Sequence, residues 1–307
     1  MSPVTILMVY ASGVKRMLDV TLSALFRHSA GHPFELRVIT DQKDEAALAE
    51  VSDSGIRAIP YDVGNPKSQS GQHGRLLDRA VRDLDNAPFF LTMDSDCFPI
   101  ADGWLKALMD LQADDVAAAG ILFPWAPPPP DLGQETIEWK LRGSQNWTNT
   151  HPACQLVRTD LMCSNGWKFA DPDGNDVNFG FLKKAKTAGY RVVGLMPTRG
   201  PLADPGLESV IDPEMNRLES VIFGDLIYHH VGATRECRGL MSGKAEFFKK
   251  SRERVYNEAG AEWMLLPGNS HVFRLDNEEE VARVRMESAY RTMAMYLQDH
   301  DRLFSDN

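Results

Sequence analysis

The stretch Ala87-Pro-Phe-Phe-Leu-Thr-Met-Asp-Ser-Asp-Cys-Phe-Pro99 decides which fold the chain is expected to have. Its apolar run from Phe89 to Met93 is bounded by a turn signal, and such a run is typical of a buried strand. Asp94 and Asp96 follow at once, at the strand end where open α/β sheets bind their ligands. Mg²⁺ and Mn²⁺ commonly take one or two carboxylates together with substrate phosphates. The stretch predicts half of a metal site, although acidic pairs in turns also cap helices or face solvent.

The first half of the chain alternates between strand and helix patterns. In chain order, the pattern predicts strands at 4–10, 34–40, 56–61, 89–93 and 116–123, and helices at 14–27, 44–52, 75–84 and 104–111. This alternation is the rhythm of βαβ units. It predicts an α/β fold in which a Rossmann-like nucleotide-binding sheet is flanked by helices. Residues 10–13, Asp41 and the acidic pair all fall at the carboxyl ends of predicted strands, where such parallel sheets bind ligands.

The second half of the chain has a different pattern. The proline run 127–130 forbids regular structure and marks a loop. Aromatic and polar residues follow, and the sequence then predicts a helix at 177–188 and a strand at 191–195. Residues 198–219 are predicted to be an irregular insertion, and residues 277–298 a terminal helix that packs on the body.

Composition narrows the class of protein. The chain has 307 residues, 43% of them apolar and 25% charged, which suffices for a sizeable core. Its net charge of −10 disfavours broad attraction to nucleic acid or anionic lipid, without excluding a local basic groove. The first residues lack the pattern of a signal peptide and no run of about 18 apolar residues occurs, so we expect a cytoplasmic protein without a membrane span.

The cysteines are scattered along the chain, at Cys97, Cys154, Cys163 and Cys237. None of them forms a Cys-x-x-Cys pair, so the sequence suggests neither a zinc site nor a disulfide framework. We expect them to be small buried hydrophobes.

Two histidines lie in a further polar cluster of the second half. In Asp225-Leu-Ile-Tyr-His-His-Val-Gly232, His229 and His230 end an apolar strand before a glycine turn. Neighbours on a strand point to opposite faces, so at most one of the two histidines is expected to reach a metal ion. A lone histidine is equally compatible with a structural role.

Two other clusters resemble ligand sites less specifically. Asp176 precedes the amphipathic helix predicted at 177–188, where it would either point into the crevice or offset the helix dipole. The glycine-containing loop 68–79 leads into a helix with Arg75 in its first turn, and His73 lies close by. A helix start and a guanidinium favour a diphosphate, although a plain solvent loop fits the pattern equally well.

Taken in order, these segments resemble the GT-A fold glycosyltransferases, most closely the large inverting family 2 type. The resemblance runs from Val4 to about Arg235, and the Asp94-Ser-Asp96 stretch resembles the family's DXD motif. The other matching segments are Gly103-Trp-Leu-Lys-Ala-Leu108, Asn165-Gly-Trp-Lys-Phe169, and Asn175-Asp-Val with the later Ala188-Gly-Tyr-Arg191.

The resemblance implies a set of site residues. The nucleotide would be held at the ends of the first two strands by Val9, Tyr10, Ala11 and Asp41. Further candidates for contact with the nucleotide-sugar are His73 and Arg75 from the glycine-containing loop, and Asp94 and Ser95 from the acidic stretch. The metal, Mn²⁺ or Mg²⁺, would be held by Asp94 and Asp96 with His229 or His230. The opening strand ends in Tyr10-Ala-Ser-Gly13, where the family often has Asn.

The resemblance also implies a reaction. A sugar would pass from a nucleoside-diphosphate sugar to an acceptor hydroxyl, with inversion, while the metal stabilises the leaving diphosphate. The family's catalytic base falls on Asp176, and the acid that normally precedes it is replaced by Asn175. Aromatic residues available to stack on acceptor or sugar are Trp147, Trp167 and Phe169, although aromatic residues are more often in the core.

Three regions follow from the resemblance and the pattern. Residues 1–123 are expected to form the nucleotide-sugar-binding half, and residues 124–240 a smaller acceptor-side and catalytic half of the same GT-A domain. Residues 241–307 are expected to form a C-terminal helical extension.

Several alternatives stay open. A retaining GT-A glycosyltransferase also pairs an Asp-x-Asp with a late histidine but does not need Asp176 as a base. A non-catalytic nucleotide-binding scaffold is favoured by Asn175, whereas a phosphohydrolase and a sugar nucleotidyltransferase fit the motifs less well. A glycan, a small molecule, a protein or a hydroxymethylated nucleobase are all compatible as acceptor, and charge does not favour nucleic acid. The sequence leaves the oligomeric state open.

Overall fold

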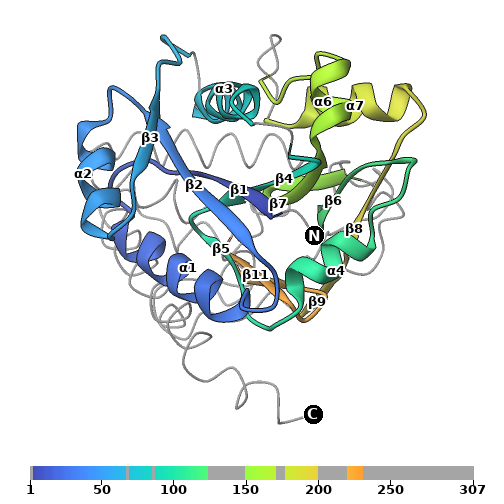
Figure 1. The fold of residues 1–307 in the computed structure, drawn as a ribbon, viewed down its shortest axis with the longest axis horizontal. Helices are drawn as coiled ribbons and strands as arrows, with labels where there is room; N and C mark the ends of the chain where they lie inside the picture. Colours follow the sequence, from blue (N-terminus) through green and yellow to red (C-terminus); the bar gives the residue numbers. More distant parts are fainter. Residues whose placement is uncertain are drawn as a thin grey trace, which may run out of the picture.

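The computed structural model describes residues 3–66, 69–84, 87–123, 149–170, 177–199 and 220–230. Its centre is a seven-stranded sheet in the order β3-β2-β1-β4-β7-β6-β8, with helices on both faces (Figure 1). A four-stranded sheet in the order β5-β11-β10-β9 packs on one of these faces. The predicted α/β class, with a Rossmann-like sheet flanked by helices, is confirmed.

The elements of the first half are β1 (Val4–Val9), α1 (Lys15–His28), β2 (Phe34–Asp41), α2 (Glu45–Asp53), β3 (Ala58–Tyr61), α3 (Gln69–Arg82), β4 (Phe89–Asp94), β5 (Cys97–Pro99), α4 (Trp104–Asp110) and β6 (Val116–Phe123). Those of the second half are β7 (Asn149–Arg158), α6 (Thr159–Ser164), α7 (Phe179–Thr187), β8 (Arg191–Leu195), β9 (Pro197–Arg199), β10 (Ser220–Phe223) and β11 (Ile227–His230).

The large sheet differs from the prediction in one strand. β7 was not predicted, and it runs antiparallel to its neighbours β4 and β6, whereas β1, β2, β3 and β4 run parallel to one another. The sheet is therefore mixed rather than wholly parallel. The pattern hid β7 because Pro152 and the polar residues before it interrupt its apolar run.

A hydrophobic core lies on each face of the large sheet. On one face, α1, α2 and α4 pack with the small sheet, whose Phe98 and Tyr228 rings lie 4.9 Å apart. On the other face, α3, α6 and α7 pack around residues such as Leu77, Phe169 and Phe181. Figure 1 shows α3, α6 and α7 together on one side of the sheet, and α1 and α4 on the other. The two cores therefore hold the strands of the large sheet, and the residues at their ends, in place.

The cysteines only partly follow the expectation. Cys97 and Cys154 are buried, and burial raises the pKa of the Cys97 thiol well above its usual value. Cys163, at the end of α6, is exposed, so the expectation of a buried thiol is wrong there. Solvent reaches this residue because it lies on the outer side of a short surface helix.

Several predictions concern residues outside the described ranges. They are the proline run 127–130, residues 200–219 of the predicted insertion, the terminal helix 277–298 and the whole of the extension 241–307, together with Trp147, Asn175, Asp176 and Cys237. Residues 198–199 of that insertion belong to β9, so the prediction of irregular structure is wrong there. Among the helices that the structure describes, none is long and apolar enough to cross a membrane.

Candidate functional site

The acidic pair lies where the two sheets join. β4 ends at Asp94, which is paired in register with Val9 of β1, and β5 begins three residues later. The connecting turn is fixed to α1, because the buried Thr21 hydroxyl donates to the Ser95 carbonyl at 2.7 Å. Asp96 is buried in this turn, whereas Asp94 is partly exposed. The turn thus directs one carboxylate into the protein and leaves the other at the sheet edge.

The small sheet brings a histidine to the acidic pair. β11 pairs antiparallel with β5 and places His229 opposite Cys97. The His229 Nε2 atom lies 3.9 Å from Asp96 Oδ1, and both side chains are buried. Of the two neighbouring histidines, His229 therefore faces the acidic pair, while the side chain of His230 lies outside what the structure describes.

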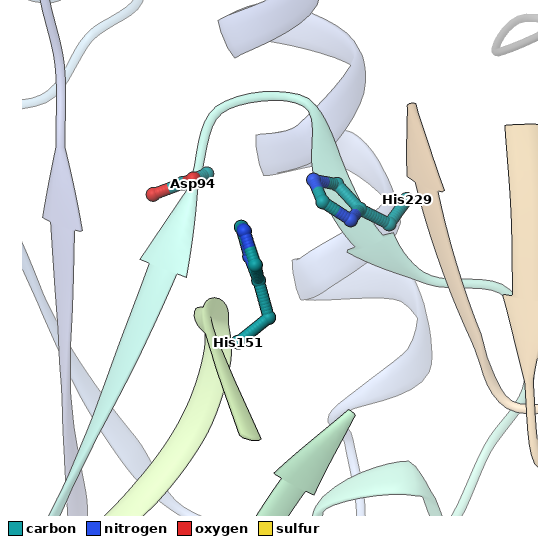
Figure 2. Close-up of side chains that lie close together, drawn as sticks. All are labelled: Asp94, His151 and His229. Carbon is teal, nitrogen blue, oxygen red and sulfur yellow. The ribbon is translucent and has the colours of Figure 1, made fainter. Parts of the chain in front are cut away.

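A second histidine, not singled out from the sequence as a site residue, completes the cluster. Asp94, His151 and His229 each offer a ligand atom, and these atoms lie within 4.8 Å of one another. Figure 2 shows the His151 ring pointing between the other two side chains, and its centroid is 5.1 Å from that of His229. The available signal was a histidine directly before the run 152–157, which the structure shows to be buried, but without a predicted strand the histidine could not be placed in the fold.

An irregularity of β7 puts His151 there. Leu122 of β6 pairs with Thr150 and Gly120 pairs with Gln155, so two steps along β6 correspond to five along β7. Such bulges commonly redirect side chains next to functional sites. Gly120 is required at this point, because a Cβ there would lie 2.4 Å from the Cys154 carbonyl oxygen. The extra residues carry His151 away from the ladder toward Asp94.

The donor set fits a divalent cation. Asp94 and Asp96 provide the oxygen ligands that Mg²⁺ and Mn²⁺ prefer, and an imidazole nitrogen of His229 is a ligand more suited to Mn²⁺ than to Mg²⁺. Buried carboxylates are costly unless they are paired or bound to a cation. Asp96 is such a buried carboxylate, at 4% exposure. The residues present therefore suit a metal ion shared between the two sheets.

Helix α3 lies on the face of the large sheet that does not carry the small sheet, and it contributes residues to the site from that side. His73 Nε2 lies 3.5 Å from Asp94 Oδ1, and burial lowers the pKa of His73 to about 4, so the ring is neutral near pH 7. The helix begins at Gln69, earlier than predicted, so the prediction that Arg75 lies in its first turn is wrong. The Arg75 guanidinium donates to the Val63 carbonyl at 3.0 Å.

The ends of β1 and β2 continue the same sheet edge. Asp41 is buried and accepts hydrogen bonds from the Lys43 backbone N–H at 3.0 Å and from Gln72 Nε2 at 2.8 Å. The Tyr10 side chain is buried and its hydroxyl donates to Glu50 of α2. The sequence-predicted residues Val9, Tyr10, Ala11, Asp41, Asp94 and Ser95 thus follow the carboxyl ends of three adjacent strands.

The predicted acceptor-side residues divide into two groups. Trp167 and Phe169 lie in the core beneath α7, so the interpretation that they stack on a sugar or acceptor is wrong. Asp176 lies outside the described residues, and the chain resumes at the buried residues Val177 and Asn178. The part of the candidate site that the structure describes is therefore formed by the strand ends and the residues around Asp94.

Among the comparisons with known proteins, only the comparison of structures finds similar proteins. No protein-family model and no curated protein matches the sequence. Among solved structures, the chain is similar to glucosyl-3-phosphoglycerate synthase from Mycobacterium tuberculosis. The complex with phosphoglyceric acid is 14% identical, covering 62% of this chain and 69% of that one, with a TM-score of 0.44. The complex with Mn²⁺, UDP-glucose and phosphoglyceric acid is 15% identical, covering 67% and 75%, with a TM-score of 0.42.

Proposed function

We propose that the chain is a metal-dependent glycosyltransferase that moves a sugar from a nucleoside-diphosphate sugar to an acceptor hydroxyl with inversion. The observation that carries the proposal is the gathering of Asp94, His151 and His229 at the carboxyl edge of the sheet, with Asp96 Oδ1 3.9 Å from His229 Nε2. Open α/β sheets bind nucleotides at this edge. The resemblance of the Asp-Ser-Asp stretch and its neighbours to GT-A fold enzymes supports the same reaction.

The donor half of the mechanism uses the described residues. Mn²⁺ or Mg²⁺ held by Asp94, Asp96 and His229 supplies Lewis-acid stabilisation of the leaving diphosphate when it is bound. Asp41 presents a buried carboxylate, held by Gln72, toward the edge where the nucleoside lies. His73 stays neutral beside Asp94, so it does not compete with the cation by charge.

The acceptor half of the proposal rests on the sequence. Asp176 takes the proton of the acceptor hydroxyl as that oxygen attacks the anomeric carbon from the face opposite the diphosphate. A positioned general base contributes about 10²- to 10⁴-fold in rate. Asn175 beside it is neutral, so the acid that precedes the base in the family is absent from this chain.

A nucleoside-diphosphate release assay tests the proposal. Common nucleotide-sugars are screened with and without Mn²⁺ on the wild type, Asp96→Ala, Asp176→Asn and the exposed control Asp110→Ala. Release in the wild type and the control should require metal and should be lost in Asp96→Ala. Asp176→Asn should keep donor binding and lose about 10²- to 10⁴-fold in turnover.

Two results would contradict the proposal. One is the absence of any nucleotide-sugar that is bound or cleaved in the presence of Mn²⁺ or Mg²⁺, which would favour the scaffold alternative. The other is an Asp96→Ala variant with wild-type turnover. Once a donor is identified, the anomeric configuration of the product, measured by NMR, separates inversion from retention.

A further inference from the structure

We propose that His151 is a hydrogen-bond donor to the diphosphate of the donor substrate and not a third metal ligand. This inference rests on the proposed function and assigns a catalytic role to a residue that the motif does not contain. It follows from the hydrogen bonding of the ring, from its place in the cluster and from the way β7 holds it.

The hydrogen bonding of the ring fixes which nitrogen carries the proton. The Ala153 backbone N–H donates to His151 Nδ1 at 3.1 Å. A neutral imidazole has one N–H and one lone pair, and here the lone pair at Nδ1 is used by Ala153. The proton therefore resides on Nε2, and a protonated nitrogen does not bind a metal ion. To become a ligand through Nε2, His151 would have to move its proton to Nδ1 and give up the bond to Ala153.

The place of the ring suits a donor to phosphate. His151 lies between Asp94 and His229, the two residues that approach it from different sheets (Figure 2). A cation at Asp94, Asp96 and His229 would share its coordination with substrate phosphates. The ring projects between these two side chains, beside the position that the diphosphate oxygens would take (Figure 2). An N–H aimed at a departing anion stabilises the charge that develops during the reaction.

A buried polar network holds the bulge that carries His151. The Gln155 and Asn178 side-chain amides bond to each other in both directions, at 2.8 and 3.2 Å. The Thr150 hydroxyl donates to Gln155 Oε1, and Asn178 Nδ2 donates to the Thr150 carbonyl at 2.9 Å. All three side chains are fully buried. Because a displaced bulge would leave these buried groups without partners, the network fixes the strand on both sides of the ring.

The N-terminus of α7 shares this network. Asn178 has the left-handed backbone conformation, with a φ of 79°, and its backbone N–H donates to the Phe169 carbonyl at 3.1 Å. Asn tolerates this conformation better than most residues. The same side chain that begins α7 therefore braces the strand that presents His151, and the donor orientation is built into the fold before any ligand arrives.

Separate measurements of metal and nucleotide binding test the assignment. Mn²⁺ affinity is measured by electron paramagnetic resonance without nucleotide, on the wild type, His151→Ala, His151→Gln and His229→Ala. Both His151 variants should bind Mn²⁺ within about twofold of the wild type, whereas His229→Ala should lose about tenfold or more. Nucleoside-diphosphate affinity at saturating Mn²⁺ should fall about tenfold in His151→Ala, since a hydrogen bond to a charged group is lost.

The glutamine variant separates a donor from a ligand. Its side-chain amide offers an N–H near the position of the histidine Nε2–H. His151→Gln should therefore recover most of the nucleoside-diphosphate affinity and of the turnover that His151→Ala loses. Ser29→Ala, which removes a buried hydrogen bond from Trp104 Nε1 far from the site, is the control for folding and should match the wild type in both affinities.

Nitrogen NMR of the wild type gives a readout that does not depend on any variant. The chemical shifts of the His151 ring nitrogens should report the Nε2–H form both without metal and with Mg²⁺. Loss of Mn²⁺ affinity in both His151 variants, an Nδ1–H form with Mg²⁺, or unchanged nucleoside-diphosphate affinity in His151→Ala would overturn the inference. A wild type that binds no divalent cation would overturn the proposed function as well, so the two failures are distinguishable.

Discussion

At the scale of single residues, Asp78 links helix α3 to the backbone of residues 169–170, which follow α6 in the chain. Its carboxylate accepts hydrogen bonds from the backbone N–H groups of Phe169 at 2.7 Å and Ala170 at 3.2 Å. The approach is close enough that a Cβ on Gly74 would lie 2.8 Å from the Ala170 backbone. Desolvation raises the pKa of Asp78 even though the two N–H donors and Lys168 lower it.

Asp78→Asn tests the cost of this buried charge. A carboxyl group with a raised pKa binds its proton more tightly in the folded protein than in the unfolded chain. Its contribution to stability is therefore greatest below the unfolded pKa and falls as the pH rises through the folded pKa. The difference in unfolding free energy between the wild type and Asp78→Asn, from urea titrations at pH 4 to 7, should shift in favour of the wild type as the pH falls. A difference that does not vary with pH would contradict the raised pKa.

Gly120→Ala tests the close approach of β6 and β7. An added Cβ would lie 2.4 Å from the Cys154 carbonyl oxygen and 2.9 Å from the Gln155 Cα atom, so the strands must separate. We expect a loss of about 1 to 3 kcal/mol in unfolding free energy. Gly31→Ala is the matched control, because nothing lies within 4 Å of a Cβ there. Equal stability of the two variants would show that the bulge is not tightly packed.

At the scale of elements, β7 is held by the side chains that fill its bulge. Gln155→Met keeps the approximate size of the side chain but removes the acceptor of the Thr150 hydroxyl and the donor to Asn178 Oδ1, both of which are buried. We expect a loss of about 1 to 3 kcal/mol, measured by urea unfolding. The variant should also weaken nucleoside-diphosphate binding by about as much as His151→Ala.

A double variant shows whether the network acts through His151. If it does, Gln155→Met should have little further effect on nucleoside-diphosphate affinity in a His151→Ala background, because coupled residues are not additive. Fully additive losses would mean that Gln155 affects the site by another route. Ser29→Ala serves again as a change to a buried hydrogen bond that lies away from the site.

Most strands of the large sheet could be predicted from the sequence, whereas β7 could not. Strands β1, β2, β4, β6 and β8 are rich in apolar and β-branched residues and are bounded by turn signals, and the bounds of β6 and β8 agree with the prediction. The acidic pair was predictable because it directly follows β4. His151 was missed because its strand contains Pro152 and a bulge, which break the period of two on which strand prediction depends. The register that brings Thr150 next to Gln155 is a tertiary property that no local pattern records.

At the scale of the whole molecule, the candidate site connects the two sheets. Asp94 belongs to the large sheet and His229 to the small one, and the turn with Asp96 is a covalent link between the two sheets. A ligand bound to both sheets stabilises the folded state by mass action. Mn²⁺ with a nucleoside diphosphate, each at about 100 times its dissociation constant, should raise stability by about 2.7 kcal/mol per ligand.

Thermal unfolding measures this stabilisation. The midpoint should rise by roughly 5 °C or more with both ligands present. Asp96→Ala should abolish the rise, whereas the exposed Asp110→Ala should retain it. An equal rise in Asp96→Ala would place the ligand elsewhere on the protein.

The pairing of β5 with β11 also has a consequence for synthesis on the ribosome. The carboxylates leave the exit tunnel early, while His229 belongs to the last strand that the structure describes. At about 5 to 20 residues per second, the nascent chain carries the acidic pair for on the order of ten seconds before the histidine emerges. Translation that stops anywhere in this interval yields a fragment with both carboxylates and no His229. Such a fragment lacks β11, the strand that pairs with β5, so premature termination removes one side of the candidate site.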